Sequence, residues 1–321
     1  MINIRTSKHM LREINSMELI RLAEADPDIF VLDADLMSSS GLKAFAGKYP
    51  DRAVNCGIQE ANMMGVAGGL SAVGFIPVVH SFAAYAVRRT LDQIFMAGCY
   101  NQQNIKIIGT DPGVCSAANG GTHMTFEDIA IMRALPGITI VDPTDEVMLK
   151  SLLPQIIQAH GVAYIRLFRK NKRVIYRDDT EFTLGKAQVV RPGTDITIIA
   201  EGPLMVFEAI QAAEKLEAQG ISAQVVDVVS LKPLDEQLIL ETAAKTGAVL
   251  TAENHSITGG LGSAVAELLA DHRLGIPFGR IGFPEMVGET GTVDYILQRF
   301  GMTHAEIAAH AITLVGEKDE Q

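Results

Sequence analysis

Cysteine is scarce in this sequence of 321 residues, which contains three: Cys56, Cys99 and Cys115. They are widely spaced and form no CxxC pair, so they provide neither the disulfide framework of a small secreted domain nor the ligand spacing of a zinc site. We interpret them as reduced thiols that pack as small hydrophobic residues. Their number and spacing favour a cytoplasmic protein.

Long apolar runs and an excess of basic residues are also missing. No uninterrupted apolar run approaches the roughly 20 residues of a membrane-spanning helix, and the N-terminal segment lacks the apolar region of a signal peptide. Lysine and arginine number 27 against 38 acidic residues, for a net charge of −11. We therefore expect a soluble protein without affinity for nucleic acid or an anionic membrane, in which any bound phosphate is held by local groups.

Several catalytic signatures are absent too. The sequence contains no GxSxG, HExxH, Walker A or GxGxxG motif, so serine hydrolases, zinc proteases, P-loop enzymes and Rossmann-type dehydrogenases lack support. The turn GGLGS, Gly259–Ser263, precedes a helical pattern and could hold an anion. Because it has neither the dinucleotide spacing nor a P-loop lysine, we favour a structural turn that packs helix on strand.

Short strand-like runs alternate with helical patterns through both halves of the chain. They occupy residues 29–32, 52–55, 75–80, 104–110, 138–142 and 162–168, then residues 196–200, 223–229 and 248–251. This alternation predicts mostly parallel sheets with helices on both faces. We therefore predict an α/β protein with two domains, residues 1–172 and 193–321, joined by a charged linker at 173–192. The tail after Val315 is expected to fray.

The segment from Asn55 to Gln93 carries the most unusual feature of the sequence. Glu60 begins a predicted helix, residues 59–72, that consists mainly of small residues and methionine and is otherwise almost free of charge. On chemistry alone, the helix dipole and the free N–H groups of the first turn would satisfy this carboxylate without any functional role. A functional role for Glu60 needs support from the rest of the chain.

Two further groups are candidate ligand contacts. His123 lies in the loop NGGTH, where the glycines would let a substrate reach the ring, although a lone histidine is more often a hydrogen-bonded structural residue. Arg166 and Arg169 lie at the end of a predicted strand. We interpret these two as the favoured anion binders, because arginine can bind a phosphate through two N–H groups.

Five stretches together resemble the C-terminal half of transketolases: VLDADLMSSS (31–40), NCGIQEANMMGVAGGL (55–70), HSFAAYAVR (80–88), NGGTHMTFEDIAIMRALPGITIVDPTD (119–145) and RLFRK (166–170). That half comprises the pyrimidine-binding domain of a thiamine diphosphate enzyme and the transketolase C-terminal domain. The later stretches LKPLD (231–235) and ENHSITGGLG (253–262) also resemble 1-deoxyxylulose-phosphate synthases and the β subunits of 2-oxoacid dehydrogenases. The second domain therefore identifies the superfamily, and the first domain points to ketol transfer.

The resemblance implies roles toward the cofactor for four residues. Glu60 matches the catalytic glutamate that hydrogen-bonds N1′ of the aminopyrimidine and favours the imino tautomer that deprotonates the thiazolium carbon. Burial among the neighbouring methionines would favour a protonated carboxyl that shares this proton. Phe82 and Tyr85 match an aromatic wall on which the pyrimidine stacks, and Asp35 matches an acidic residue near the cofactor at the subunit interface.

The resemblance also implies roles toward the substrate. His123 matches the catalytic histidine that contacts an oxygen of the sugar donor, and Ser39 and Arg169 resemble the pair that holds a sugar phosphate. Thr110 stands where many transketolases have histidine, and Asn119 where many have an aspartate that contacts a sugar hydroxyl. Replacing a potential cation by a hydroxyl removes a charge-assisted hydrogen bond to phosphate, so we expect an unusual ketose or a phosphate that is bound differently.

One motif of the superfamily is missing. Diphosphate and Mg²⁺ are held there by a GDG motif followed by asparagine, and this sequence contains no GDG. We therefore expect thiamine diphosphate to bind across an interface, with Mg²⁺ and the diphosphate held mainly by a separate N-terminal subunit and no metal ligands from this chain. The small residues and methionines of the helix at 59–72 suit such an interface, and an α2β2 assembly is expected.

These observations predict the C-terminal subunit of a two-chain transketolase, a transferase that is active only with its partner. The alternatives are the β subunit of a 2-oxoacid dehydrogenase, a 1-deoxyxylulose-phosphate synthase-like enzyme and a non-catalytic scaffold. The presence of Glu60, Phe82 and His123 together disfavours the scaffold. The sequence does not name the ketose donor or the aldose acceptor.

Overall fold

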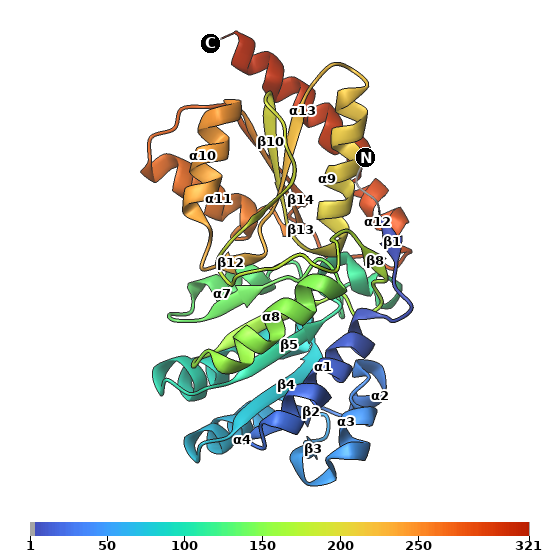
Figure 1. Ribbon diagram of the computed structural model, residues 1–321, viewed down its shortest axis with the longest axis vertical. Helices are drawn as coiled ribbons and strands as arrows, with labels where there is room; N and C mark the ends of the chain where they lie inside the picture. Colours follow the sequence, from blue (N-terminus) through green and yellow to red (C-terminus); the bar gives the residue numbers. More distant parts are fainter. Residues whose placement is uncertain (1–3, 321) are drawn as a thin grey trace.

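The computed structural model describes residues 4–320, which form two α/β domains arranged one above the other along the long axis (Figure 1). The elements of the first half are β1 (Arg5–Thr6), α1 (Leu11–Ala25), β2 (Ile29–Asp33), α2 (Met37–Ser40), α3 (Lys43–Lys48), η1 (Pro50–Arg52), β3 (Ala53–Asn55), α4 (Glu60–Ala72), β4 (Ile76–Phe82), α5 (Ala83–Arg88), α6 (Leu91–Gln93), the π-helix η2 (Ile94–Tyr100), β5 (Lys106–Thr110), η3 (Gly113–Asn119), α7 (Asp128–Ala134), β6 (Thr139–Val141), α8 (Glu146–Gln158), β7 (Ala163–Leu167) and β8 (Arg173–Val174). Those of the second half are β9 (Gln188–Arg191), β10 (Ile196–Ala200), α9 (Gly202–Glu217), β11 (Ala223–Asp227), β12 (Ser230–Lys232), α10 (Glu236–Thr246), β13 (Val249–Ser256), α11 (Leu261–Asp271), β14 (Phe278–Phe283), α12 (Val293–Arg299) and α13 (His304–Asp319).

The lower domain is built on a seven-stranded sheet in the order β12-β6-β7-β5-β4-β2-β3. All its strands are parallel except β12, which pairs antiparallel with β6. Neighbouring residues on each strand face opposite cores: Val78 packs with the side of α1 and α8, whereas Val79 packs with the side of α4. Both faces of the sheet are therefore buried, which explains why its strands read as continuous apolar runs rather than alternating ones.

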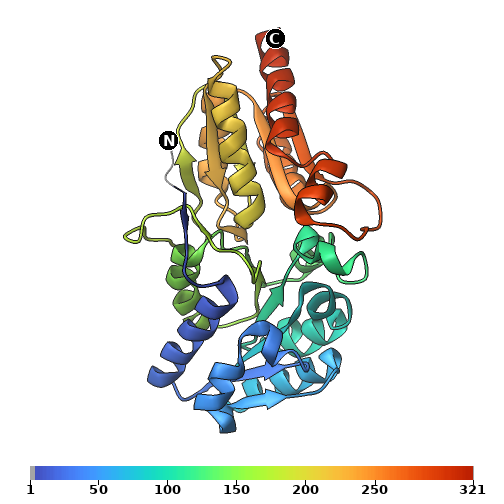
Figure 2. The same ribbon diagram turned by 90° about the vertical axis from the view of Figure 1, so that its right-hand side faces the viewer.

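The upper domain has a five-stranded sheet in the order β14-β13-β10-β11-β9, parallel except for the edge strand β9. Helices α9 and α13 cover one face, and α10 and α11 cover the other, as the two views show (Figure 1, Figure 2). The predicted α/β fold with two mostly parallel sheets is confirmed.

The serine run after β2 forms the one-turn helix α2. One local prediction, that for the C-terminal tail, needs correction. The tail after Val315 continues α13 to Asp319 instead of fraying, because Lys318 Nζ donates to the carbonyls of Asp195 at 2.9 Å and Thr246 at 3.4 Å. The last residue, Gln321, lies outside the described residues.

The predicted linker at 173–192 is more structured than its charged composition indicates. Its first residues form β8, which pairs with β1, and Asp145 accepts the backbone N–H groups of Ile175 and Tyr176 at 2.8 and 2.9 Å. Its last residues form β9 in the upper sheet. In return, β12 from the second half of the sequence completes the lower sheet. Backbone hydrogen bonds therefore join the two domains, because a strand from the second half of the sequence pairs within the sheet of the first domain.

Among the described residues, no helix combines the length and the apolar composition needed to cross a membrane. The three cysteines are all unpaired and partly buried.

Candidate active site

The parallel strands of the lower sheet bring the predicted site residues to one edge. Glu60 follows β3, Asp35 and Ser39 follow β2, and Phe82 ends β4. Tyr85 lies one turn later in α5, and Arg169 follows β7. Because the carboxyl ends of parallel strands open on the same side, residues separated by more than a hundred positions meet there.

Glu60 occupies the first position of α4 and its side chain is only 3% exposed. Both carboxylate oxygens accept hydrogen bonds from Nη1 of Arg89, at 3.2 and 3.1 Å. The neighbouring Met63 and Met64 are buried as expected. The partner of Glu60, the guanidinium of Arg89, is a group that no sequence pattern indicated.

Three rings form a cluster beside this ion pair. The ring centroids of Phe82 and Tyr85 lie 6.1 Å apart, and the imidazole of His123 lies 5.9 Å from the first and 5.4 Å from the second, each contact close to edge-on. Nδ1 of His123 lies 3.0 Å from the hydroxyl oxygen of Thr122. The histidine of the glycine-rich loop and the predicted aromatic wall therefore belong to one surface.

Arg169 extends the same surface toward β2. Its guanidinium lies 5.0 Å from the ring centroid of Phe82, pairs with the buried carboxylate of Asp111, and donates from Nη1 to the carbonyl of Ser39 at 3.3 Å. Burial raises the pKa of Asp111, and the charge of Arg169 opposes this shift. The predicted partners Ser39 and Arg169 are thus in direct contact.

The remaining predicted residues differ in accessibility. Asp35 is exposed, and its carboxylate accepts an N–H of the Asn55 side chain at 3.2 Å. Asn119 is exposed at the end of η3. Thr110 is buried beside Phe82 in the sheet register, and its hydroxyl donates to the carbonyl of Ser81 at 3.3 Å. Thr110 therefore lies beside Phe82 in the sheet, with its hydroxyl bonded to the backbone.

Arg166 is a clear correction, because it is fully buried and cannot be an exposed anion-binding residue. Its guanidinium is within 2.9 Å of three carboxylates, those of Asp128, Asp142 and, from the second domain, Glu201. Burial raises the pKa of Asp142 to about 6 and raises that of Glu201 well above its ordinary range, although Arg166 opposes both shifts. Arg166 therefore joins the two domains. The sequence alone gave no reason to assign Arg166 a different role from Arg169.

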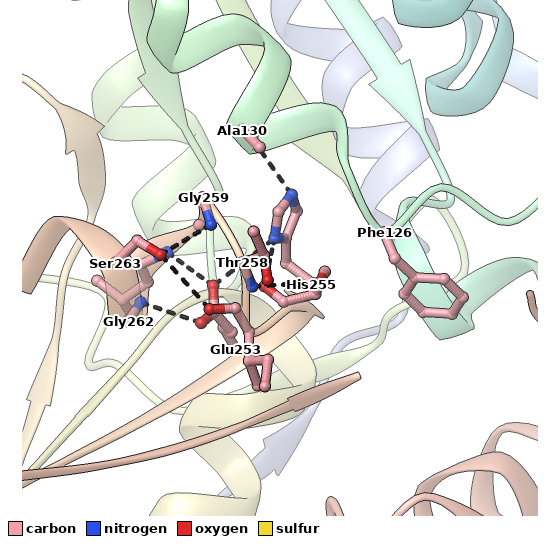
Figure 3. Close-up of polar contacts among 12 residues, drawn as sticks. Phe126, Ala130, Glu253, His255, Thr258, Gly259, Gly262 and Ser263 are labelled. Atoms are coloured by element: carbon pink, nitrogen blue, oxygen red, sulfur yellow. Dashed lines mark hydrogen bonds and ion pairs between the residues drawn. The ribbon is translucent and has the colours of Figure 1, made fainter. Parts of the chain in front are cut away.

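The turn Gly259–Ser263 binds the side chain of Glu253 from the same protein (Figure 3). The carboxylate of Glu253 accepts the backbone N–H groups of Leu261 at 2.7 Å and Gly262 at 3.0 Å, at the N-terminus of α11. A Cβ at Gly260 would lie 2.0 Å from a Glu253 oxygen, so glycine is needed for this close approach. The preferred interpretation as a structural turn is supported, since the helix N-terminus is already filled by Glu253.

Gly120 and Gly121, beside His123, are also required by the packing of the two domains. A Cβ at Gly120 would lie 2.5 Å from the hydroxyl of Thr290, and one at Gly121 would lie 2.6 Å from the carbonyl of Gly288. The loop therefore needs its glycines because the second domain packs directly against it. The sequence alone indicates only that such glycines would let a substrate reach the ring.

The chemistry of the site fits one part of thiamine diphosphate. A buried carboxylate beside a face of aromatic rings suits an aminopyrimidine, which offers ring nitrogens and a flat surface. Among residues 4–320, no group of three or more His, Cys, Asp or Glu side chains is placed to hold a metal ion. The described residues of the site thus fit the pyrimidine ring.

Comparison with known proteins identifies the same two parts. Residues 7–174 match the family described as transketolase, pyrimidine binding domain, and residues 185–307 match transketolase, C-terminal domain. The chain is 47% identical over 312 residues to the 6-deoxy-6-sulfo-D-fructose transketolase subunit SqwH of Clostridium sp. (strain MSTE9), covering 97% of this chain and 96% of that protein. It is 37% identical over 298 residues to an apulose-4-phosphate transketolase subunit of Phocaeicola vulgatus, covering 92% of this chain and 95% of the relative.

Solved structures agree with these matches. A split gene transketolase solved as an inactive beta4 tetramer has 40% sequence identity and a TM-score of 0.89, covering 97% of this chain and 99% of that one. The transketolase from Leishmania mexicana shares the fold at 19% identity and a TM-score of 0.81. This chain covers only 47% of the Leishmania chain, so it corresponds in length to about half of that protein.

Proposed function

Because this chain belongs to the transketolase family, we propose that it is the C-terminal subunit of a two-chain, thiamine diphosphate-dependent transketolase that moves a two-carbon ketol unit from a ketose to an aldose. The observation that carries this proposal is the row formed by Glu60, Tyr85, His123 and Arg169 along one edge of the lower sheet. These residues supply a pyrimidine site and a substrate surface, and a separate N-terminal subunit with a GDG motif supplies the ligands of Mg²⁺ and the diphosphate.

The coverage of the relatives supports the two-chain arrangement. The two relatives described above as transketolase subunits are covered over 95% or more of their length, whereas 1-deoxy-D-xylulose-5-phosphate synthases of 32–35% identity are covered over only 46–47%. The protein of this family solved as a beta4 tetramer is described as inactive. We propose that this chain is likewise inactive alone and works in an α2β2 assembly in the cytoplasm.

Each residue of the row has a distinct task in the proposed reaction. Bound thiamine diphosphate supplies the nucleophilic thiazolium carbon. Glu60 holds a proton at the pyrimidine ring nitrogen, and Tyr85 and Phe82 position the ring by stacking. His123 hydrogen-bonds an oxygen of the sugar donor. Asp35 lies on the exposed rim of the site, where it faces the partner subunit.

Arg169 and Ser39 form the proposed contact for the far end of the donor. The guanidinium binds a terminal anion, and Asn119 on the exposed rim contacts a sugar hydroxyl. Thr110 brings no cation to this end, so phosphate loses one charged partner and a tetrahedral sulfonate becomes an equal candidate. We propose a ketose with a terminal phosphate or sulfonate, and 6-deoxy-6-sulfo-D-fructose is the first donor to test because of the relative named for it.

The test is reconstitution of the chain with the GDG-containing subunit from the same organism. Donor consumption with an added aldose is measured for 6-deoxy-6-sulfo-D-fructose and for fructose 6-phosphate, and CO₂ release from pyruvate is measured in parallel. Ketol transfer without CO₂ release is expected, and it requires both subunits. CO₂ release with acyl transfer would instead identify a 2-oxoacid dehydrogenase or 1-deoxyxylulose-phosphate synthase-like enzyme.

The variant Arg169→Ala tests the substrate contact. Loss of a charge-assisted contact to a terminal anion should raise KM for the ketose by about ten- to a hundredfold, with a smaller effect on kcat. An uncharged ketose should be used equally well by the wild type and the variant. Equal losses with both donors would show that Arg169 only maintains the fold around Asp111.

A further inference from the structure

Arg89 makes the two contacts that the proposed function assigns to the aminopyrimidine ring. Its Nη1 donates to both oxygens of Glu60, and its guanidinium carbon lies 4.3 Å from the centroid of the Tyr85 ring. A guanidinium and an aminopyrimidine are both flat groups that carry nitrogen donors, and here the single atom Nη1 donates to both oxygens of Glu60. The same carboxylate and the same ring face therefore bind a side chain of this protein.

We propose that Arg89 is an internal stand-in for the pyrimidine of thiamine diphosphate, which keeps the site closed in the isolated chain and leaves it when the cofactor and the partner chain arrive. This inference rests on the proposed function. It makes the Arg89 side chain a gate that controls access of the cofactor to the same site. It explains why a buried carboxylate, required in the assembled enzyme, is tolerated in the free chain. An unpaired buried carboxylate would destabilise the free chain.

The position of Arg89 suits a group that has to leave. Its side chain is 51% exposed, whereas that of Glu60 is 3% exposed, so only one member of the pair is fixed by the interior. The exposed guanidinium can therefore move away without displacing the buried carboxylate. Arg89 also lines a groove of about 730 Å³ together with Leu91, Asp92 and Phe95. Asp92 offers a carboxylate in this groove for the released guanidinium.

The neighbouring arginine is not an equivalent candidate. Arg88 pairs with the carboxylate of Glu127 and donates from Nη2 to the carbonyl of Met124 at 2.8 Å. These contacts lie on the side of the His123 loop and do not include Glu60. Of these two arginines, Arg89 is the one that combines the Tyr85 ring and the Glu60 carboxylate.

The proposal predicts a penalty on cofactor binding that the variant Arg89→Met removes. If the closed arrangement is populated about ten times more than the open one, the apparent affinity for a pyrimidine ligand falls about tenfold. The measurement is calorimetric titration of the full isolated chain with 4-amino-5-hydroxymethyl-2-methylpyrimidine and, separately, with thiamine diphosphate. Arg89→Met should bind both ligands about tenfold more tightly than the wild type.

Three further variants make the test specific. Arg173→Met is the matched control, since Arg173 is also an exposed arginine stacked on a ring, 3.9 Å from the centroid of Phe207, and should bind like the wild type. Arg89→Lys keeps the charge but lacks the flat guanidinium that lies over the Tyr85 ring, and a several-fold gain is expected. The double variant Arg89→Met/Glu60→Gln should lose the gain, because the ligand needs the carboxylate.

A cooperative thermal unfolding transition shows that a variant is folded. If Arg89→Met does not fold, the comparison is made with Arg89→Lys. The inference is overturned if both Arg89 variants bind no more tightly than Arg173→Met while thiamine diphosphate does bind to the wild-type complex of this chain with its GDG-containing partner. If the wild-type complex does not bind the cofactor at all, the proposed function itself fails and the gate fails with it. The titration of the complex therefore separates the two failures.

Discussion

Phe126 of the first domain lies flat against Phe283 of the second, with ring centroids 3.5 Å apart and planes 3° apart. Phe126 comes three residues after His123, and Phe283 ends β14 and also contacts Phe300 at 4.5 Å between centroids. In the helix that follows Phe126, the backbone N–H of Ala130 donates to Nε2 of His255 at 3.3 Å (Figure 3). The second domain therefore supports the segment that carries His123, although it contributes none of the predicted site residues.

Truncation of this aromatic contact should cost stability. Phe283→Ala removes a fully buried ring and should lower the free energy of unfolding by about 3–5 kcal/mol, measured by urea denaturation. Phe207→Ala is the control, because Phe207 is only partly buried beneath Arg173, and a clearly smaller loss is expected. Equal losses in the two variants would mean that the stacked pair adds nothing beyond ordinary burial.

Gly288 should affect catalysis more than folding. A Cβ at this position would lie 2.6 Å from the sulfur of Met124 and 3.3 Å from Cα of Gly121, so Gly288→Ala has to push on the loop that carries His123. We expect kcat/KM of the reconstituted enzyme to fall about tenfold, with a stability loss of about 1–3 kcal/mol from overpacking. Gly316→Ala, where an added methyl meets open space within helix α13, should leave kcat/KM unchanged and should not lower stability. Wild-type activity in Gly288→Ala would show that the loop position is not limiting.

Glu253 should make stability depend on pH. Burial raises its pKa from 4.5 to about 7, against the two backbone N–H groups that favour the ionised form. The folded state therefore holds this proton more tightly than the unfolded state, and the stabilisation present at low pH is lost as the pH rises from about 4.5 to about 7. At 1.36 kcal/mol per unit, this single group accounts for up to about 3 kcal/mol.

The variant Glu253→Gln isolates that effect. Asp142 and Asp227, whose burial raises their pKa values to about 6 and about 7, titrate in both proteins and cancel in the difference. The free energy of unfolding, measured by denaturant titration from pH 5 to pH 8, should fall more steeply for the wild type than for the variant. Parallel curves for the two proteins would exclude a shifted pKa at Glu253.

Glu60 should be needed for turnover but not for folding. In the reconstituted enzyme, Glu60→Gln should lower kcat by about 10²–10⁴-fold, because an amide cannot hold and release the proton at the pyrimidine nitrogen. Glu267→Gln is a suitable control, since its carboxylate pairs with Arg133 on the surface and makes no contact with the row. Unchanged activity in Glu60→Gln would support the non-catalytic scaffold.

The sequence predicted the layers of the fold well, because a strand buried on both faces must be apolar along its whole length and therefore stands out from the helices around it. The six strand-like runs of the first half correspond to β2, β3, β4, β5, β6 and β7. Strand β12 was missed because its three residues follow closely after β11 and pair with the other domain. A segment of three residues is too short to show the alternation of apolar and polar residues by which a strand is recognised.

The resemblance of the sequence to transketolases indicates functional roles for Glu60, Tyr85, His123 and Arg169. The order of the parallel strands is enough to place the loops that carry these residues on one edge of the sheet. Only the tertiary structure decided how the arginines around the site pair with carboxylates. It buried Arg166 among three carboxylates, left Arg169 partly exposed, and placed Arg89 between Tyr85 and Glu60. Residue type and local pattern determine what a side chain can bind. Which partner it has and how deeply it is buried depend on which distant segments of the chain pack together, and only the whole fold determines that.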